Sequence, residues 1–85
     1  VELNENNFSS NNGELVLIDS TAKYLADKKD TNIVVVIDTE NLKSKGIEYK
    51  NISAEFIAKY RSRLVSIKIK SVNGSGETIF TEVLV

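Results

Sequence analysis

The stretch Ile33-Val34-Val35-Val36-Ile37 decides the fold of this chain of 85 residues. Five consecutive β-branched residues favour an extended strand, because branching at Cβ restricts the side chain in a helix and packs well on a pleated sheet. A run that is apolar at every position is typical of a central strand covered on at least one face. We therefore expect a β-sheet built around residues 33–37.

A second strand is predicted at Leu64–Ser71, where the apolar residues Val65, Ile67 and Ile69 alternate with polar ones. This period of two indicates one buried face and one face in contact with water. The closing run Glu77–Val85 is also typical of a strand. The second half of the chain therefore adds two strands to the sheet.

The segment Asn73-Gly74-Ser75-Gly76 separates these two strands. Asn and Gly adopt positive φ more readily than other residues, so the segment predicts the turn of a β-hairpin. We expect Ile69 to lie across from Ile79 and Val65 across from Val83. Both pairs would then face the core.

Weaker strand patterns occur at Leu15–Ile18 and Ile47–Ile52, and Val1–Leu3 is a candidate edge strand. The Asn-rich stretch Asn4–Asn12 is predicted to be a solvated loop. Its side-chain oxygens could ligate Ca²⁺, but they lack the regular spacing of a known calcium loop.

Two short helices are predicted between the strands. Ser20 or Asp19 would cap the first, which runs to about Lys29, and Ser53 would cap the second, which runs to about Ser62. A side-chain oxygen at this position accepts a hydrogen bond from an otherwise unpaired N–H of the first turn. The residues spaced i, i+3 and i+4 that would face the sheet are Ala22, Leu25 and Ala26 in one helix and Ala54, Ile57 and Ala58 in the other. Helices this short need packing on a sheet for stability.

These elements predict an α+β fold: a two-layer sandwich of one mixed sheet of five to six strands with two short helices on one face. The alternative is a β-grasp-like arrangement with a single main helix. A shift of 32 residues aligns the first helix and strand with the second, without gaps, so two β-α-β repeats are a further hypothesis. Two unrelated β-α-β units would show a similar periodicity.

The chain contains no His and no Cys. It therefore lacks the commonest general base and the best nucleophile, and Ser-His-Asp and Cys-His arrangements are excluded within it. The only Gly-rich segment lies in the predicted hairpin turn and not between a strand and a helix, where a phosphate loop would stand. We predict a domain without catalytic activity or cofactor. No apolar run approaches the roughly 18 residues that a membrane helix requires.

An enzymatic alternative uses Asp19 and Asp38, which each follow an apolar strand, with Glu40 close to the second. Acids at the carboxyl ends of neighbouring parallel strands can hold Mg²⁺. The segment Ile37–Asn41 is similar to the first acidic motif of nucleases of the PIN-like type. Those domains are longer and need further acids on later strands, whereas the later strand here ends in Lys70. The competing interpretation is that the first Asp caps a helix and the second favours a turn.

The net charge of −1 hides an uneven distribution. Residues 1–42 carry three Lys against eight acids, a balance of −5, and residues 43–70 carry eight bases against two acids, a balance of +6. The candidate anion-binding residues are Lys43, Lys45, Lys59, Arg61, Arg63, Lys68 and Lys70. Such a segment can form a basic face that attracts anions, unless the two halves neutralise each other in the folded domain.

Three aromatic residues, Tyr49, Phe56 and Tyr60, are interleaved with these bases. Nucleic-acid binders show the same mixture. Packing of a helix on a sheet explains aromatics at a spacing of i, i+4 better than base stacking does. An anionic cell-wall polymer is therefore favoured over nucleic acid as the anion.

Three segments together, Asn32–Thr39, Ile52–Tyr60 and Val65–Lys70, carry a resemblance to a known kind of domain. The pattern of strand, Ile-Ser-Ala-Glu opening a short helix, and Lys-rich strand resembles small accessory modules of secreted and S-layer-type surface proteins of low-GC Gram-positive, clostridial-type bacteria. The resemblance implies an extracellular, non-catalytic spacer or binding module. It assigns no functional residue.

Because the chain begins at Val1 and not at Met, we expect residues 1–85 to be a single domain and a fragment of a larger protein. The predicted function is a non-catalytic interaction or spacer module of a bacterial secreted or cell-surface protein, with a protein or an anionic cell-wall polymer as partner. A cytoplasmic origin is the alternative location. The alternative function is an anion-binding module that uses the basic segment 43–70. A third hypothesis, a protein-docking domain, predicts an exposed apolar patch or an open sheet edge at Val1–Leu3 or Leu84.

Overall fold

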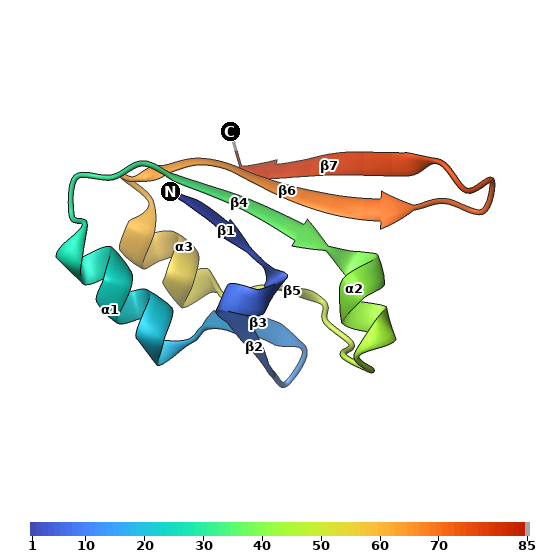
Figure 1. Ribbon diagram of the computed structural model, residues 1–85, viewed down its shortest axis with the longest axis horizontal. Coiled ribbons are helices and arrows are strands. Elements are labelled where there is room, and N and C mark those ends of the chain that lie inside the picture. Colours follow the sequence, from blue (N-terminus) through green and yellow to red (C-terminus); the bar gives the residue numbers. More distant parts are fainter. Residues whose placement is uncertain (85) are drawn as a thin grey trace.

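The computed structural model describes residues 1–84 and has, in that range, three α-helices, one 3₁₀-helix and seven strands (Figure 1). In chain order these are β1 (Glu2–Asn4), η1 (Glu5–Asn7), β2 (Phe8–Asn11), β3 (Glu14–Leu17), α1 (Asp19–Asp27), β4 (Ile33–Asp38), α2 (Thr39–Ser44), β5 (Asn51–Ile52), α3 (Ala54–Tyr60), β6 (Leu64–Val72) and β7 (Thr78–Leu84). The α+β class predicted from the sequence is confirmed.

The strands form two sheets, a four-stranded sheet in the order β1-β4-β6-β7 and a three-stranded sheet in the order β2-β3-β5. The prediction of one sheet of five to six strands is therefore wrong. Strand β4 pairs with β6 on one side and with β1 on the other, so no position beside it is left for β3. Strand β3 pairs instead with β2 across a tight turn at Asn12 and Gly13, which have φ of 54° and 84°. Of the predicted strand Ile47–Ile52, only Asn51–Ile52 is extended.

The Asn-rich stretch is ordered secondary structure and not the predicted solvated loop. The Asn4 side chain accepts a hydrogen bond from the N–H of Asn6, and the Asn7 side chain accepts one from the N–H of Asn4, at 2.9 and 3.0 Å. This reciprocal cap begins η1, and the buried Phe8 then begins β2. The predicted edge strand at Val1–Leu3 is confirmed, since β1 lies at the edge of the four-stranded sheet.

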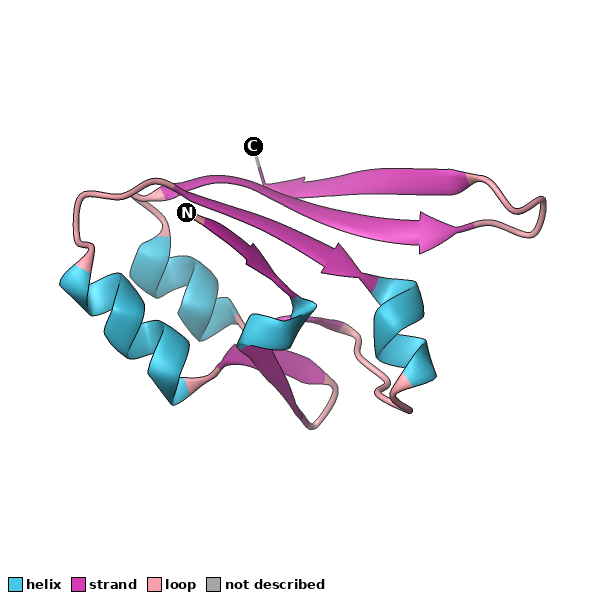
Figure 2. Ribbon diagram, viewed as in Figure 1, coloured by secondary structure: helices cyan, strands magenta, loops and turns pink. Residues whose placement is uncertain are grey.

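All three α-helices and the three-stranded sheet lie on the same face of the four-stranded sheet (Figures 1 and 2). The core lies between these layers. Its buried apolar residues are Leu3, Phe8, Leu15, Leu25, Ile33, Val35, Ile37, Leu42, Ile52, Phe56, Tyr60 and Ile67. Among residues 1–84, no helix or sheet covers the opposite face of the four-stranded sheet.

The helices turn only some of the predicted residues to the core: Leu25 is buried, and Ala22 and Ile57 are half-buried. In α3 the buried side chains are Phe56 and Tyr60, whereas Ala54 and Ala58 are exposed. In α1 the side chains of Thr21 and Leu25 are buried, and Ala26 is exposed. Burying an aromatic ring removes far more apolar area from water than burying a methyl group, so the rings determine which side of α3 packs inward.

The helix caps also differ from the prediction. Ser53 does occupy the N-cap of α3, but its side chain makes no capping hydrogen bond. Asp19 is the first residue of α1, and the N-cap is Ile18, which has no side-chain oxygen. Packing on the sheet, and not a side-chain N-cap, therefore stabilises the beginnings of these two short helices.

Strands β4 and β6 pair in parallel at a register of 32 residues, from Val34 opposite Ser66 to Asp38 opposite Lys70. This register equals the shift that aligns the two halves of the sequence. Helix α1 connects β3 to β4, helix α3 connects β5 to β6, and β3 also pairs in parallel with β5. The two connections therefore have the same topology, while their origin by duplication stays a prediction.

A register shift at the start of β6 changes which residues of this strand face the core. Ile33 pairs with Leu64, but Val34 pairs with Ser66, so Val65 is an extra residue on β6. Leu64 packs against the core, while Val65 is 49% exposed. The predicted core position of Val65 is wrong because a bulge breaks the alternation of period two.

The hairpin is confirmed, but its predicted register is wrong by two residues. Ile69 pairs with Thr81, and Ile79 pairs with Ser71. The Asn73 side chain accepts hydrogen bonds from the N–H groups of Ser75 and Glu77, so the turn is centred on Ser75. The predicted pairing of Ile69 with Ile79 would need a turn centred on Gly74, one residue earlier.

Candidate functional site

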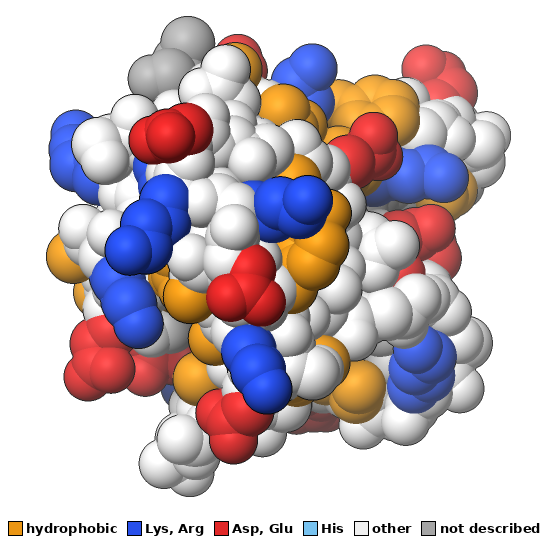
Figure 3. Space-filling model, turned by 60° about the vertical axis from the view of Figure 1, so that its left-hand side comes forward, with side chains coloured by type: hydrophobic (Ala, Val, Ile, Leu, Met, Phe, Trp, Pro, Cys, Tyr) orange, Lys and Arg blue, Asp and Glu red, His pale blue; other side chains and the backbone are white. Residues whose placement is uncertain are grey.

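The seven predicted anion-binding residues lie on or next to three elements. Lys43 lies on α2 and Lys45 directly follows it; Lys59 lies on α3, with Arg61 and Arg63 after it; and Lys68 and Lys70 lie on β6. Helix α2 contacts β6, and the chain passes from α3 into β6 directly after Arg63. On the face shown in Figure 3, basic and acidic side chains are interspersed.

Several of these bases already have partners inside the domain. Lys70 pairs with Asp38 and Lys43 with Glu40, each at 3.6 Å. The Arg63 guanidinium donates to the backbone carbonyls of Leu25 and Thr31 at 3.0 and 3.1 Å and also to that of Lys28. Arg63 therefore binds the carbonyl groups at the end of α1, which is a structural task.

The Asp38 carboxylate also has partners inside the domain. It accepts hydrogen bonds from the N–H groups of Glu40 and Asn41, at 3.0 and 3.3 Å, and so caps α2, the helix that the sequence did not predict. Asp19 follows β3 of the smaller sheet, so the two aspartates do not stand at neighbouring strand ends. Among residues 1–84, no group of three or more His, Cys, Asp or Glu side chains is placed to hold a metal ion.

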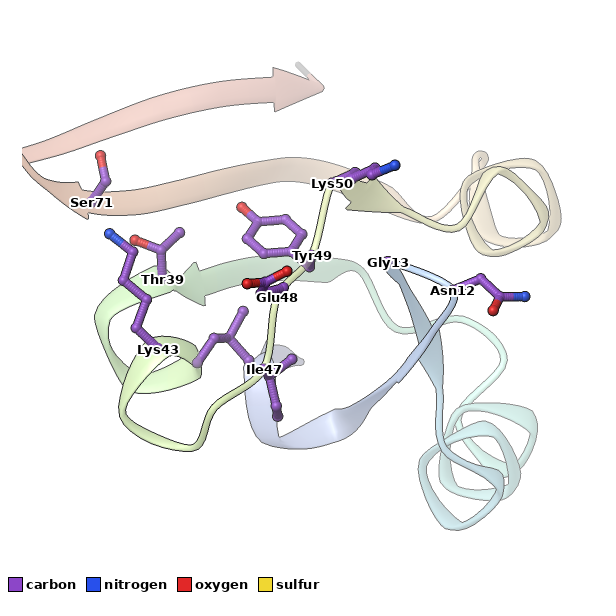
Figure 4. Close-up of a pocket in the computed structure, with 10 residues that line it drawn as sticks. Asn12, Gly13, Thr39, Lys43, Ile47, Glu48, Tyr49, Lys50 and Ser71 are labelled. Carbon is purple, nitrogen blue, oxygen red and sulfur yellow. The ribbon is translucent and has the colours of Figure 1, made fainter.

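A cleft with a volume of about 860 Å³ lies between α2, the turn before β3 and the underside of β6. Leu42, Ile47 and Tyr49 form its apolar part, and the lining is completed by Asn12, Gly13, Thr39, Lys43, Glu48, Lys50 and Ser71. Figure 4 shows the Tyr49 ring in the middle, between Thr39 and Lys43 on one side and Lys50 on the other. Sequence reasoning missed this site because its walls come from residues 12–13, residues 39–50 and Ser71, which are far apart in the chain.

The charges of the cleft do not converge. Lys43 extends beside Thr39 toward β6, and Lys50 extends in the opposite direction (Figure 4). Burial raises the pKa of the Tyr49 hydroxyl, which therefore stays protonated near neutral pH and can donate a hydrogen bond. The cleft offers an aromatic ring and hydroxyl groups to a ligand, without a cluster of bases.

The β6–β7 hairpin projects beyond the rest of the molecule (Figures 1 and 2). Strand β4 ends where Asp38 pairs with Lys70, whereas the pairing of β6 with β7 continues to Val72 and Thr78. Three apolar side chains on β7 are exposed: Ile79 at 41%, Phe80 at 55% and Val83 at 52%. The prediction that Ile79 and Val83 face the core is therefore wrong.

The outer edge of β7 is open in the described part of the chain, where β7 pairs only with β6. The N–H of Asn73 donates to the carbonyl of Glu77, and hydrogen-bonded pairs alternate along an antiparallel ladder. Ile79 and Thr81 therefore direct their backbone groups toward β6, and the residues between them direct theirs outward. Thr78, Phe80 and Glu82 present these outward N–H and C=O groups.

The two edges of the four-stranded sheet differ in how they are protected. Strand β1 has only three residues, and the exposed ones are the polar Glu2 and Asn4. Strand β7 has seven residues with a single charged side chain, that of Glu82, and is interrupted only by a register shift between its pairings with Ile67 and Lys68. Proteins protect edges by shortness, charge, proline or bulges, so β7 is the poorly protected edge.

Comparison with known proteins gives no relative. No family model matches the chain, no curated protein matches it, and no solved structure matches its fold. None of the helices in residues 1–84 has the length and apolar character needed to cross a membrane.

Proposed function

We propose that this domain is a non-catalytic interaction module that binds a partner polypeptide strand to strand along the open edge of β7. The observation that carries the proposal is the row of outward N–H and C=O groups on Thr78, Phe80 and Glu82. The backbone N–H and C=O groups of an added extended strand have the same spacing as this row, so they can pair with every group in it. The domain would thereby extend its four-stranded sheet by one strand.

The side chains beside the edge support this function. Ile79 and Phe80 point to opposite faces of the sheet and are both largely exposed, so an added strand would cover apolar area on each face. The non-catalytic part of the proposal rests on the lack of His and Cys and on the engagement of the Asp38 carboxylate by α2 and Lys70. The resemblance to accessory modules supports a bacterial secreted or cell-surface protein as the parent.

The test measures amide hydrogen exchange by NMR while a synthetic peptide is added. The peptide is an extended sequence of alternating Val and Thr with Lys at each end. Its matched control is N-methylated at every Val and Thr, so that neither edge of the control can donate a backbone hydrogen bond. We expect the unmodified peptide to slow exchange at Thr78, Phe80 and Glu82 and to leave the amides of β1 unchanged. Equal effects of both peptides, or no slowing on β7, would contradict the proposal.

Anion binding is the second candidate function. Lys43 and Lys50 lie on different sides of the cleft, so the arrangement favours an extended polyanion that reaches both lysines over a small anion that needs converging charges. Heparin is a suitable probe, because binding that depends on ion pairs weakens steeply with added salt. Binding that is lost on Lys43→Gln and Lys50→Gln together, and kept on Lys59→Gln and Arg61→Gln, would assign it to the cleft. Binding that is absent or independent of salt would reject this candidate.

A further inference from the structure

We infer that the strand bound by β7 is the β7 of a second copy of this chain, joined in an antiparallel, two-fold symmetric pair. This inference rests on the proposed function and names its partner. A symmetric pair of this kind is closed, because each copy uses its one open long edge and leaves only the short β1 edges outside. The result would be one continuous sheet of eight strands.

The backbone limits the registers that such a pair can adopt. Only residues whose N–H and C=O point outward, which are Thr78, Phe80 and Glu82, can form hydrogen-bonded pairs with the second copy. The regular part of β7 ends at Glu82, because Val83 is the extra residue at the register shift opposite β6. The regular stretch therefore spans residues 78–82, and Phe80 is its centre.

A two-fold axis at Phe80 is the register that uses all five regular residues of both copies. It places the two Phe80 rings directly opposite each other, and aromatic pairs across strands are favourable. Phe80 is also the most exposed of the exposed large apolar residues on the described chain, at 55%. The most solvent-exposed ring would thus lie at the centre of the interface.

The remaining pairs in this register are also compatible. On the other face of the sheet Ile79 lies opposite Thr81 of the second copy, which is a pair of β-branched residues. Glu82 lies opposite Thr78 of the second copy, and its neighbour within its own hairpin is Lys68. No two like charges therefore lie side by side across the interface.

The interface is small, since it consists of one strand from each copy. Stable protein interfaces bury about 1,200 Å² or more in total, so we expect weak, concentration-dependent association. The helices do not obstruct the approach, because they lie under the sheet and no element formed by residues 1–84 stands beyond the outer edge of β7 (Figure 1).

Sedimentation equilibrium tests the inference on the 85-residue chain and on two variants, Phe80→Lys and Phe80→Glu. Between about 10 μM and about 1 mM the average mass of the unchanged chain should rise toward that of two chains, as a small interface predicts. Each variant alone should stay monomeric, because the axis at residue 80 brings like charges together. An equimolar mixture of the two variants should recover association, because it brings opposite charges together.

Different results of this experiment would reject the register, the second copy as partner, or strand addition itself. Stronger association of the Phe80→Lys chain would reject this register, since it is expected if residue 80 faces Glu82 of the other copy. An unchanged chain that stays monomeric at about 1 mM, where weak pairs associate, would overturn the second copy as partner. If β7 amides still respond to the Val-Thr peptide in that case, strand addition stands; if they do not, both proposals fail. Assemblies larger than two chains would also overturn the closed pair.

Discussion

The buried carboxylate of Glu5 accepts a hydrogen bond from the side-chain amide of Asn41 at 2.6 Å. It also accepts one from the backbone N–H of Asp38 at 2.9 Å. Glu5 is only 8% exposed and belongs to η1, whereas Asn41 belongs to α2. A single acid therefore connects the N-terminal segment to the one α-helix that the sequence pattern did not predict.

This contact predicts a pH dependence of stability. Burial raises the pKa of Glu5, but the hydrogen bonds from Asp38 and Asn41 outweigh it and hold the pKa below its ordinary value of 4.5. A folded-state pKa below the unfolded one means that the stabilisation is fully present above about pH 4.5 and is lost as the pH falls through the folded value. Urea denaturation between pH 3 and pH 7 should show this loss in the unchanged chain.

The Glu5→Gln variant serves as the control for that profile. It removes the titrating group and should lower the free energy of unfolding at pH 7 by about 1–3 kcal/mol. Its stability should then change less between pH 3 and pH 7 than that of the unchanged chain. Parallel profiles for the two proteins would contradict the assigned role of Glu5.

Arg63 should matter for stability far more than its neighbour Arg61. Arg63→Ala removes the donors to three backbone carbonyls at the end of α1 and should lower the free energy of unfolding by about 2 kcal/mol. The exposed Arg61 is the matched control, and Arg61→Ala should change stability by less than about 0.5 kcal/mol. Equal effects in chemical denaturation would show that the guanidinium does not cap α1.

Two apolar positions on β6 test the bulge. Ile67 is fully buried and Val65 is 49% exposed, although they are two residues apart on one strand. Ile67→Ala should cost about 2–5 kcal/mol of unfolding free energy, because it opens a cavity in the core. Val65→Ala should cost less than about 1 kcal/mol, as for other exposed substitutions. A large effect at Val65 would instead support the unbroken alternation that the sequence suggests.

The hairpin turn offers a matched pair of glycines. Gly76 has φ of +81°, which is strained for residues with a Cβ, whereas Gly74 does not have positive φ. Gly76→Ala should destabilise the domain by about 1 kcal/mol, and Gly74→Ala should be neutral or slightly stabilising. Thermal unfolding of both variants should show a lower midpoint for Gly76→Ala than for Gly74→Ala. A lower midpoint for Gly74→Ala would contradict the positive φ assigned to Gly76.

Local sequence patterns predicted the elements that depend on local physics. The β-branched run at residues 33–37 became β4, the alternation at residues 64–71 became β6, and the turn at residues 73–76 joins β6 to β7. Helices α1 and α3 also lie where their apolar spacing predicted them. Each of these signals is contained in a window of a few residues, so one sequence is enough to detect it.

The candidate site was predicted only in part. The hypothesis of a docking domain named an open edge near Leu84, and β7 does lie at an edge of its sheet. The side chains expected to be buried there, Ile79 and Val83, are exposed instead. An alternating pattern shows that a strand has two different faces, but it does not show whether another layer covers either of them.

The sequence by itself determined the α+β class, the strands β4 and β6, the hairpin that joins β6 to β7, and the absence of His and Cys from the chain. Only the tertiary structure decided that the strands divide between two sheets and that α3 turns Phe56 and Tyr60 inward. It also decided that β7 projects with a free edge. These features depend on which distant segments occupy the places beside β4 and β6, and that competition has no signature within any single window of the chain.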